Sequence, residues 1–267
     1  MRKYFFLQKL IAYSLIVPSF ALADELKKDF SQYYSSGINE PGAILITPPK
    51  GWQAADPALL PPKVKFMVVG KGKGTYPPSI NLGTEPYKGT TKDYLKMVKQ
   101  VNESLGAECK DLGKIKTKSG SASLSQVDMN TEWGPVRMLH VVLVKNRTVY
   151  VITAGALKNE FHHYYKDFFD TIKSIRFNPD IFELVADSQK RRNLEQRYDR
   201  LIEQHESIKK RMNKEASNLA VFESADFQLN CWQPFMQIIE QDYKDLGESW
   251  KEQAMQKFRN DLVAEFE

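Results

Sequence analysis

A change of composition after Pro179 constrains the fold of this chain more than any other feature of its sequence. The rest of the chain contains one proline, Pro234, and one glycine, Gly247. Large apolar side chains recur there at alternating spacings of four and three residues, which is typical of a helix with one apolar seam. We therefore predict two domains with different architectures, residues 43–177 and residues 178–267.

The C-terminal domain is predicted to be an antiparallel helical hairpin. One seam comprises Leu194, Tyr198, Leu201, His205, Ile208, Met212, Glu215 and Leu219. A second stripe comprises Phe235, Ile239, Tyr243, Leu246, Trp250, Phe258 and Leu262. Each stripe needs apolar area against which to bury, and the nearest such area is the other stripe. Residues 220–230 are therefore expected to turn the chain between two helices.

The first seam is also the candidate surface for an unknown protein partner or for self-association, provided that it is not already occupied. The candidate partner-binding residues are Leu194, Tyr198, Leu201, His205, Ile208 and Met212. A polar residue such as His205 on a seam can set the register of a helix pair, and a buried histidine can sense pH. The simplest interpretation of His205 is a partly exposed side chain in a non-ideal hairpin.

Short strand-like runs fill the N-terminal domain. The clearest are Ala43–Thr47, Lys65–Val69, Ser79–Glu85, Ser121–Met129, Val136–Val144 and Val149–Ala156. Each is rich in valine, isoleucine and leucine or alternates apolar with polar residues. Asn146-Arg147 predicts a tight hairpin between the last two runs, and Trp133-Gly134-Pro135 predicts a turn before Val136.

Two amphipathic helices interrupt these strands. One is predicted from a threonine cap at Thr90 or Thr91 to Ser104, and the other from Asn159 to Lys173. Strands in hairpins combined with amphipathic helices predict an α+β fold, in which an antiparallel sheet packs between helices.

The first 23 residues have the pattern of a secretory signal peptide. Met1-Arg2-Lys3 is cationic, residues 10–17 are mostly apolar, and small residues precede Asp24 at the positions that a signal peptidase reads. We predict cleavage between Ala23 and Asp24 and an exported protein, periplasmic or secreted. The apolar run is shorter than the roughly 20 residues that span a bilayer, so a retained anchor is the weaker interpretation and the mature protein should have no transmembrane span.

The exported chain is nearly balanced in charge. The full chain carries +5, but three basic residues lie in the predicted signal peptide. The small remaining excess gives no reason to expect nucleic acid or anionic lipid as a partner. Residues 24–177, which begin with a polar lead-in at 24–42, hold 22 basic and 15 acidic residues. Residues 178–267 hold 13 basic and 18 acidic residues, so the two parts differ in sign.

Cys109 and Cys231 are the only cysteines, one in each predicted domain. In an oxidising compartment they could form one disulfide, which would tie the second domain to the first. The alternative is a pair of buried thiols without a bridge. Mass spectrometry of the non-reduced protein distinguishes the two.

A set of short motifs resembles the PsbP-like domains, which include the bacterial DcrB-like proteins. The motifs are Pro49-Lys50-Gly51-Trp52, Pro77-Pro78-Ser79-Ile80-Asn81 leading to Glu85, a helix around Asp93-Tyr94-Leu95, the hairpin Val136–Ala156, and Glu160-Phe161 opening a helix that closes on Ser174-Ile175-Arg176-Phe177. They cover about half of the chain, residues 43–177. The C-terminal hairpin is not part of the family pattern.

The resemblance implies a sheet between helices, with Trp52 packed inward at the start of the domain. Members of the family include a photosystem II extrinsic subunit, a Ran-binding import factor and envelope proteins, and they generally act by binding without catalysis. The resemblance therefore implies a binding scaffold, and no functional residue is carried over from it.

Gly70-Lys71-Gly72-Lys73-Gly74 looks at first like a phosphate-binding loop. A P-loop ends in Gly-Lys-Ser/Thr before a helix, whereas Thr75-Tyr76-Pro77-Pro78 follows here and cannot begin one. We predict a flexible basic turn.

His140, Glu160 and His163 are the candidates for a metal site. Glu160 and His163 are three residues apart on a predicted helix and share a face, and the fold could bring His140, in a predicted strand, close to them. The adjacent ring of His162 diverges by about 100° from His163. No further ligand follows nearby, so the sequence predicts no metal, cofactor or catalytic residue.

Three functions follow from these patterns. The leading hypothesis is an exported, non-enzymatic binding or scaffold protein of the bacterial envelope. The alternative is an exported metal-dependent hydrolase or small-molecule-binding enzyme that uses His140, Glu160 and His163. The second alternative is a secreted effector that binds a host protein.

Overall fold

The computed structural model describes residues 41–61, 63–73, 76–87, 89–212 and 215–264. The predicted signal peptide, its cleavage position at Ala23 and Asp24, and nearly all of the lead-in lie outside these residues. The described chain divides into two compact units: an α+β unit, residues 44–176, and a helical unit, residues 177–264 with 41–43. Among the described helices, none combines the length and the apolarity needed to cross a membrane.

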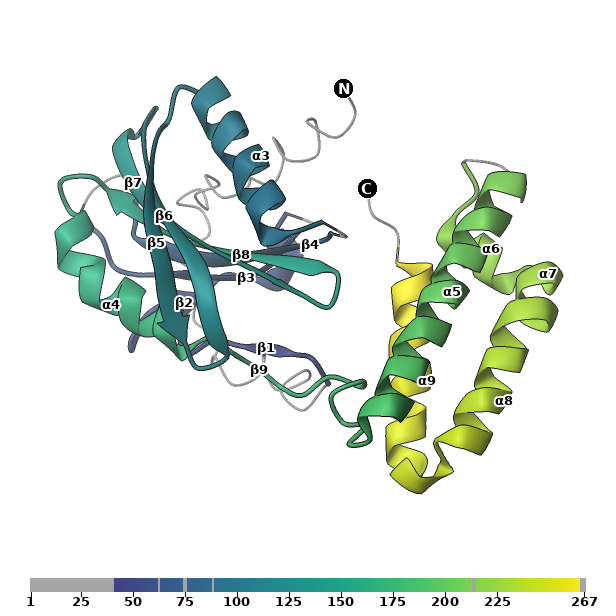
Figure 1. Cartoon of the computed structure of the whole chain (residues 1–267). Helices are drawn as coiled ribbons and strands as arrows, with labels where there is room; N and C mark the ends of the chain where they lie inside the picture. The colour runs from purple at the N-terminus through teal and green to yellow at the C-terminus, as the bar shows by residue number, and fades with distance from the viewer. Residues whose placement is uncertain (1–40, 62, 74–75, 88, 213–214, 265–267) are drawn as a thin grey trace. The chain divides into compact units, whose positions relative to one another are not determined.

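The α+β unit is built on a seven-stranded sheet in which every pair of neighbours is antiparallel (Figure 1). In spatial order its strands are β2 (Gln53–Ala54), β3 (Val64–Val69), β4 (Ser79–Pro86), β8 (Thr148–Leu157), β7 (Gly134–Lys145), β6 (Gly120–Thr131) and β5 (Glu108–Thr117). A separate two-stranded ladder joins β1 (Ile44–Leu45) to β9 (Arg176–Phe177).

The hairpin predicted at Asn146-Arg147 is confirmed. These residues have φ angles of 49° and 59°, the left-handed conformation that a two-residue type I′ turn requires. The turn sets the register of β7 against β8 along their whole length, from Lys145 opposite Thr148 to Val136 opposite Leu157.

Strand β5 is the long strand that the sequence pattern does not reveal. It pairs only with β6, so it forms one edge of the sheet, and much of it is exposed and charged. A bulge between Asp111 and Gly113 shifts the register and breaks the alternation on which strand prediction rests. Lysines and a bulge are common protections of an exposed edge.

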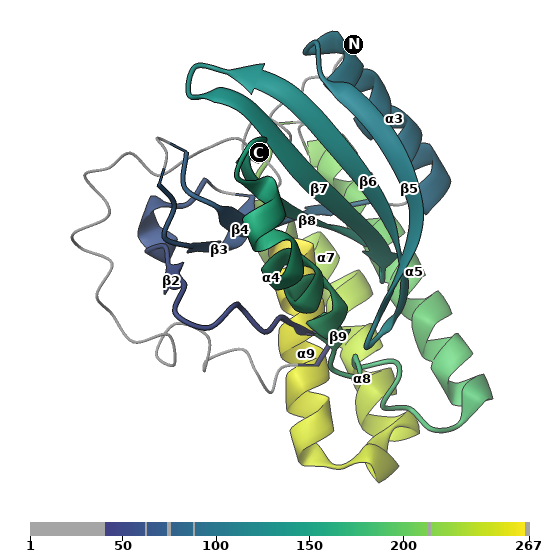
Figure 2. The same ribbon diagram turned by 90° about the vertical axis from the view of Figure 1, so that its left-hand side faces the viewer.

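Two helices cover opposite faces of this sheet, α3 (Thr91–Ser104) and α4 (Phe161–Ser174) (Figures 1 and 2). Helix α3 begins at the predicted cap, where the Thr90 hydroxyl accepts a hydrogen bond from the Asp93 N–H at 3.2 Å. The apolar face of α3 buries Tyr94, Val98 and Val101 against Val142, Val149 and Val151 of β7 and β8. The α+β class predicted from the sequence is confirmed.

The helical unit contains α5 (Ser188–Met212), α6 (Asn218–Glu223), α7 (Ala225–Phe227), the π-helix η3 (Gln228–Trp232), α8 (Gln233–Asp242), the 3₁₀-helix η4 (Lys244–Leu246) and α9 (Glu248–Val263). Another 3₁₀-helix, η2 (Pro57–Leu59), belongs to the α+β unit. One continuous core joins α5, α8 and α9, so the C-terminal region is helical as predicted, with the second predicted helix divided into α8 and α9.

A single glycine explains why the second predicted helix is divided. Gly247 has a φ of +83°, a conformation that favours glycine, and the chain turns there between α8 and α9. At the start of α8, Pro234 has no backbone N–H and cannot donate a helical hydrogen bond. The residue before it, Gln233, donates its N–H to the Gln228 carbonyl, five residues back, which is the hydrogen bond of a π-helix.

Candidate functional site

The seam predicted to bind a partner lies inside the helical unit. Leu194, Tyr198, Leu201, His205 and Ile208 are all buried in its core, and only Met212, at the end of α5, is exposed among the six candidates. The condition on which the prediction depended, a free seam, is therefore not met. The partners are internal because α8 and α9 both pack their apolar faces in this core.

The polar groups of the seam are also satisfied internally. The Tyr198 hydroxyl donates to an Asp261 carboxylate oxygen at 2.8 Å, and His205 Nε2 lies 3.1 Å from the Asn218 carbonyl oxygen. The His205 ring also meets Phe227 edge-on, at 5.1 Å between centroids. His205 is thus a buried core residue, where a partly exposed one was expected.

His140, Glu160 and His163 are not brought together. His140 shares a strand face with Val142, which packs under α3, whereas Glu160 and His163 lie at the start of α4 on the opposite face. The sheet separates them. In the described part of the chain, no group of three histidine, cysteine or acidic side chains is placed to hold a metal ion.

His140 belongs to a polar row that crosses the sheet and is buried at Asn81, His140 and Thr153. It lies opposite Thr153 on β8 and Ser125 on β6, and Asn81 on β4 lies opposite Thr153. Both ring nitrogens of His140 and the Thr153 hydroxyl lack a hydrogen-bond partner among the described residues. Burial lowers the pKa of His140 to about 4, so its ring is neutral at physiological pH.

The two cysteines lie in different units. Cys109 on β5 is partly buried, Cys231 is buried in the core of the helical unit, and both are free thiols. Burial raises the pKa of each thiol, which makes both poor nucleophiles near neutral pH. Their pairing remains a prediction for mass spectrometry.

The glycine-rich loop after β3 has a packing role. A Cβ on Gly70 would lie 2.7 Å from Cε2 of Trp52, and one on Gly72 would lie 2.9 Å from Cδ of Pro78. Trp52 itself packs edge-on against Tyr164 and Phe168 of α4, at 6.2 and 6.0 Å between ring centroids. Glycine is needed here for close approach and Trp52 has the packing role that the family resemblance implies.

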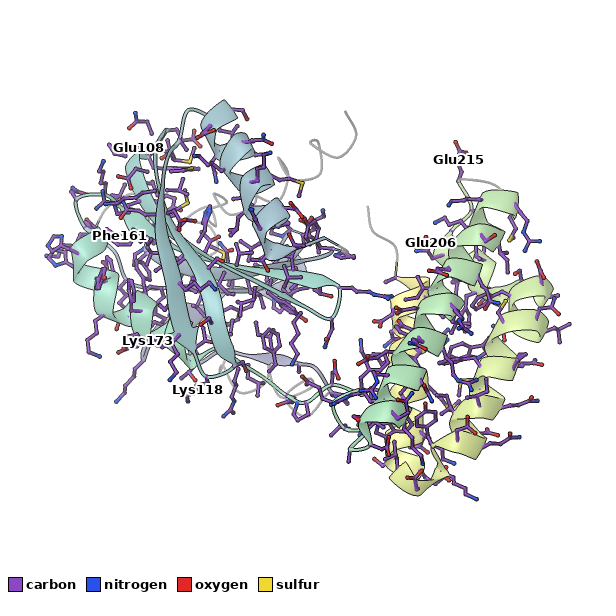
Figure 3. All side chains as sticks on the ribbon, viewed as in Figure 1. Glu108, Lys118, Phe161, Lys173, Glu206 and Glu215 are labelled. Carbon is purple, nitrogen blue, oxygen red and sulfur yellow. The ribbon has the colours of Figure 1, made fainter. Side chains whose placement is uncertain are left out.

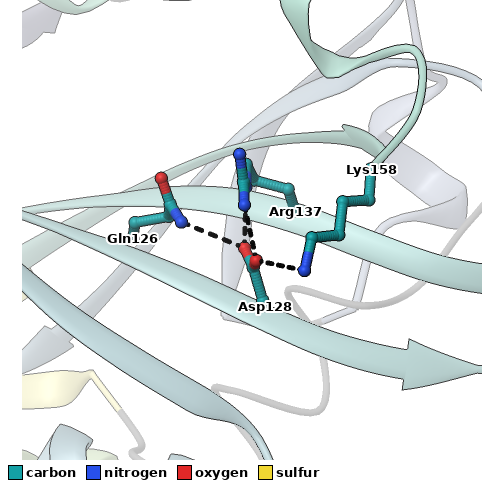
Figure 4. Close-up of polar contacts among 4 residues, drawn as sticks. All are labelled: Gln126, Asp128, Arg137 and Lys158. Atoms are coloured by element: carbon teal, nitrogen blue, oxygen red, sulfur yellow. Dashed lines mark hydrogen bonds and ion pairs between the residues drawn. The ribbon is translucent and has the colours of Figure 1, made fainter.

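An ion cluster around Asp128, near the start of α4, has the geometry of a structural contact between strands (Figure 4). Asp128 accepts two hydrogen bonds from the Arg137 guanidinium, at 2.8 and 2.7 Å, and pairs with Lys158 Nζ at 2.8 Å. The amide of Gln126 completes the group at 3.2 Å. These contacts, chiefly the hydrogen bonds from Arg137, lower the pKa of Asp128 to about 2. The carboxylate is fully engaged and joins β6, β7 and the end of β8.

An open depression of about 450 Å³ lies beside the C-terminal half of α4 in the α+β unit. We call it the lysine pocket. Its lining residues are Thr47, Pro48, Pro49, Lys50, Lys118, Asp167, Asp170, Thr171, Lys173 and Ser174. Figure 3 shows Lys118 at the tip of the β5–β6 hairpin and Lys173 near the end of α4.

Some charged side chains of the lysine pocket have an ion-pair partner and others do not. Asp170 is paired with Lys166 at 2.5 Å, and this contact lowers the pKa of its carboxyl group. Lys50, Lys118 and Lys173 form no ion pair within the part of the chain that the structure describes, although the charge of Lys173 also helps to lower the pKa of Asp170. The pocket therefore offers three ammonium groups to an anionic ligand.

Sequence reasoning missed the lysine pocket because its walls come from three distant segments. The β5–β6 turn that carries Lys118 follows β5, the strand that the sequence pattern did not predict. One signal was present: Lys50 lies in the Pro49-Lys50-Gly51-Trp52 motif, and Trp52 is the residue that anchors this loop to α4.

No protein-family model matches the chain, and no curated protein matches its sequence. Among solved structures, the chain is similar to LpqN, described as involved in cell envelope biogenesis of Mycobacterium tuberculosis, with 16% identity and a TM-score of 0.38 over 53% of this chain and 88% of that chain. It is similar to PsbP of Synechocystis sp. PCC 6803, with 12% identity and a TM-score of 0.36 over 53% of this chain and 96% of that chain. The Ran-binding protein Mog1p of Saccharomyces cerevisiae is similar at 15% identity, with a TM-score of 0.38 over 51% of this chain and 91% of that chain. A PsbP is thus among the structural neighbours, as the sequence resemblance led us to expect.

Proposed function

We propose that this chain is an exported, non-enzymatic binding protein of the bacterial envelope, which acts through contacts made by its α+β unit. The observation that carries the proposal is the lysine pocket, which is concave and charged. Its cationic lining is suited to holding an anionic group.

Two further observations support binding over catalysis. The side chains that a metal-dependent enzyme would use, His140, Glu160 and His163, lie on opposite faces of the sheet. Both thiols have raised pKa values because they are buried, so neither is activated for nucleophilic attack. Export is supported by the pattern of the first 23 residues.

Capture from envelope fractions tests the proposal. The purified protein is used as bait after brief chemical cross-linking, beside an exported protein of similar size and charge. We expect one protein to be enriched over the control bait, and to remain enriched when residues 178–267 are removed. Stoichiometric zinc in the purified protein, measured by elemental analysis, together with no enriched protein, would favour the enzyme instead.

A further inference from the structure

The walls of the lysine pocket are held in place before any ligand binds. The Thr47 N–H donates to the Ser174 hydroxyl at 2.8 Å, and the Lys118 N–H donates to the Lys173 carbonyl at 3.2 Å. The loop of residues 47–52 and the β5–β6 turn are thus both hydrogen-bonded to the last turn of α4. Trp52, packed against Phe168, fixes the other end of the loop. A preformed site loses little conformational entropy on binding.

Three ammonium groups from three separate segments surround this depression. Lys50 comes from the loop, Lys118 from the hairpin tip and Lys173 from α4, and all three side chains are exposed. Of the two lining carboxylates, Asp170 is already paired with Lys166. Like charges around one depression repel one another, so an anion that binds among them relieves this repulsion.

The form of the pocket suits an extended acidic chain better than a compact anion. Lysine is a point charge on a flexible stem and does not impose the fixed geometry with which arginine grips a single phosphate. The ammonium groups are spread over three walls of an open depression, with Asp167 among them. Carboxylates spaced along a peptide can meet the lysines one by one and avoid Asp167.

An aromatic pair on α4 meets the lysine pocket at one residue, Lys173. Tyr165 stacks on Phe169 along α4, with 4.3 Å between ring centroids, and Tyr165 is 52% exposed. Lys173 belongs to both features, because its Nζ lies 5.9 Å above the Phe169 ring. A bound segment could therefore place an apolar side chain on Tyr165 beside its carboxylates.

We propose that the lysine pocket binds an acidic segment of a protein partner, with the segment's carboxylates against Lys50, Lys118 and Lys173 and an apolar side chain against Tyr165. This proposal rests on the proposed binding function and names the chemistry of the partner segment.

The test measures binding of synthetic peptides to the purified protein by fluorescence anisotropy. The probe is a labelled glutamate-rich peptide with one phenylalanine, and its controls replace every glutamate by glutamine or the phenylalanine by serine. We expect the glutamine peptide not to bind, and the serine peptide to bind more weakly. Raising the salt from about 50 mM to about 300 mM should weaken binding of the probe, because exposed charges are screened.

Two double variants make the same change of charge, one at the pocket and one on another face of the unit. Lys118→Glu with Lys173→Glu should weaken probe binding about tenfold or more, since two attractions become repulsions. Lys92→Glu with Lys96→Glu, exposed on α3 at the opposite face, should change it less than about twofold. All four lysines are exposed, so both proteins should fold as the parent does, which circular dichroism checks.

An equal loss in both double variants would overturn the proposal, because it would show unspecific attraction to net charge. Binding to vesicles of phosphatidylglycerol and phosphatidylcholine that depends on Lys118 and Lys173, without peptide binding, would overturn it in favour of a membrane surface. If the envelope partner is still captured by the Lys118→Glu, Lys173→Glu protein, the pocket is excluded while the binding function stands.

Discussion

At the scale of single residues, His140 has an unusual position for an ionisable side chain. It is 2% exposed, both of its nitrogens lack a partner among the described residues, and burial lowers its pKa from 6.5 to about 4. A buried polar group without a partner costs free energy, so something other than stability must explain its presence. Metal binding does not explain it, because no group of three histidine, cysteine or acidic side chains in the described residues is placed to hold a metal ion.

The depressed pKa of His140 predicts a loss of stability in mild acid. The unfolded chain binds a proton on this ring more readily than the folded chain, so unfolding is favoured as pH falls below the unfolded pKa of about 6.5. Between about pH 7 and about pH 5 the expected loss from this group is about 2 kcal/mol. Urea unfolding of the parent and of His140→Leu across this range measures it.

His140→Leu should flatten this acid limb and should be as stable as the parent at neutral pH, or more so, because it removes an unsatisfied group. A loss of more than about 2 kcal/mol at neutral pH would contradict this, and would mean that the ring has a partner.

Asp128 also makes the fold less stable as pH falls, but at lower pH than His140. Its contacts with Arg137 and Lys158 lower its folded pKa from 3.8 to about 2, so they stabilise the fold above the unfolded value and are lost as pH falls toward 2. Asp128→Asn should cost about 2 kcal/mol at neutral pH, since it leaves Arg137 and Lys158 without their anion. Chemical denaturation at neutral pH and near pH 3 measures the effect, and the variant should lose less stability on acidification. An unchanged acid limb would contradict this assignment.

At the scale of elements, the glycine-rich loop after β3 distinguishes packing from phosphate binding. Gly70→Ala should destabilise the fold by about 1–3 kcal/mol, because its new methyl group would overlap the Trp52 ring. Lys71→Ala and Lys73→Ala should change stability by less than about 0.5 kcal/mol, since both side chains are exposed. Thermal unfolding of the three variants decides. A stable Gly70→Ala protein would mean that Trp52 can move aside.

Several elements follow directly from local sequence. The Asn146-Arg147 turn, the Thr90 cap and the apolar face of α3 depend on residues close together in the chain, and each was predictable. Strand β5 was not, because edge strands carry charge on both faces and its bulge resets the period. The lysine pocket was not, because it requires the tertiary register of β5 with β6 and their contact with α4.

The division of the helical unit has a similar cause. A seam shows that a helix buries one face, but not which helices bury it. The sequence pattern predicted one helix packed against α5. Because the chain turns at Gly247, two helices, α8 and α9, pack there. Once both are counted, Leu194 and Leu201 have no surface left to offer a partner.

At the scale of the whole molecule, the two compact units predict independent folding. A chain of residues 24–177 retains the whole seven-stranded sheet, α3 and α4. It loses the hydrogen bonds of Gly42 to Pro179 and of Asn178 to Ala43, which lie at the boundary. We expect a cooperative unfolding transition and dispersed amide signals in a nuclear magnetic resonance spectrum. Aggregation of this chain, or signals without dispersion, would show that the α+β unit depends on the helices.

The central claim is that the α+β unit acts by holding a protein at the lysine pocket. Site-specific photocross-linking in the native cells tests it most directly, with a photoreactive phenylalanine placed at position 118 or, as control, at position 92 on α3. The account predicts one cross-linked protein from position 118 and none from position 92. No adduct from position 118, or the same adducts from both positions, would contradict it.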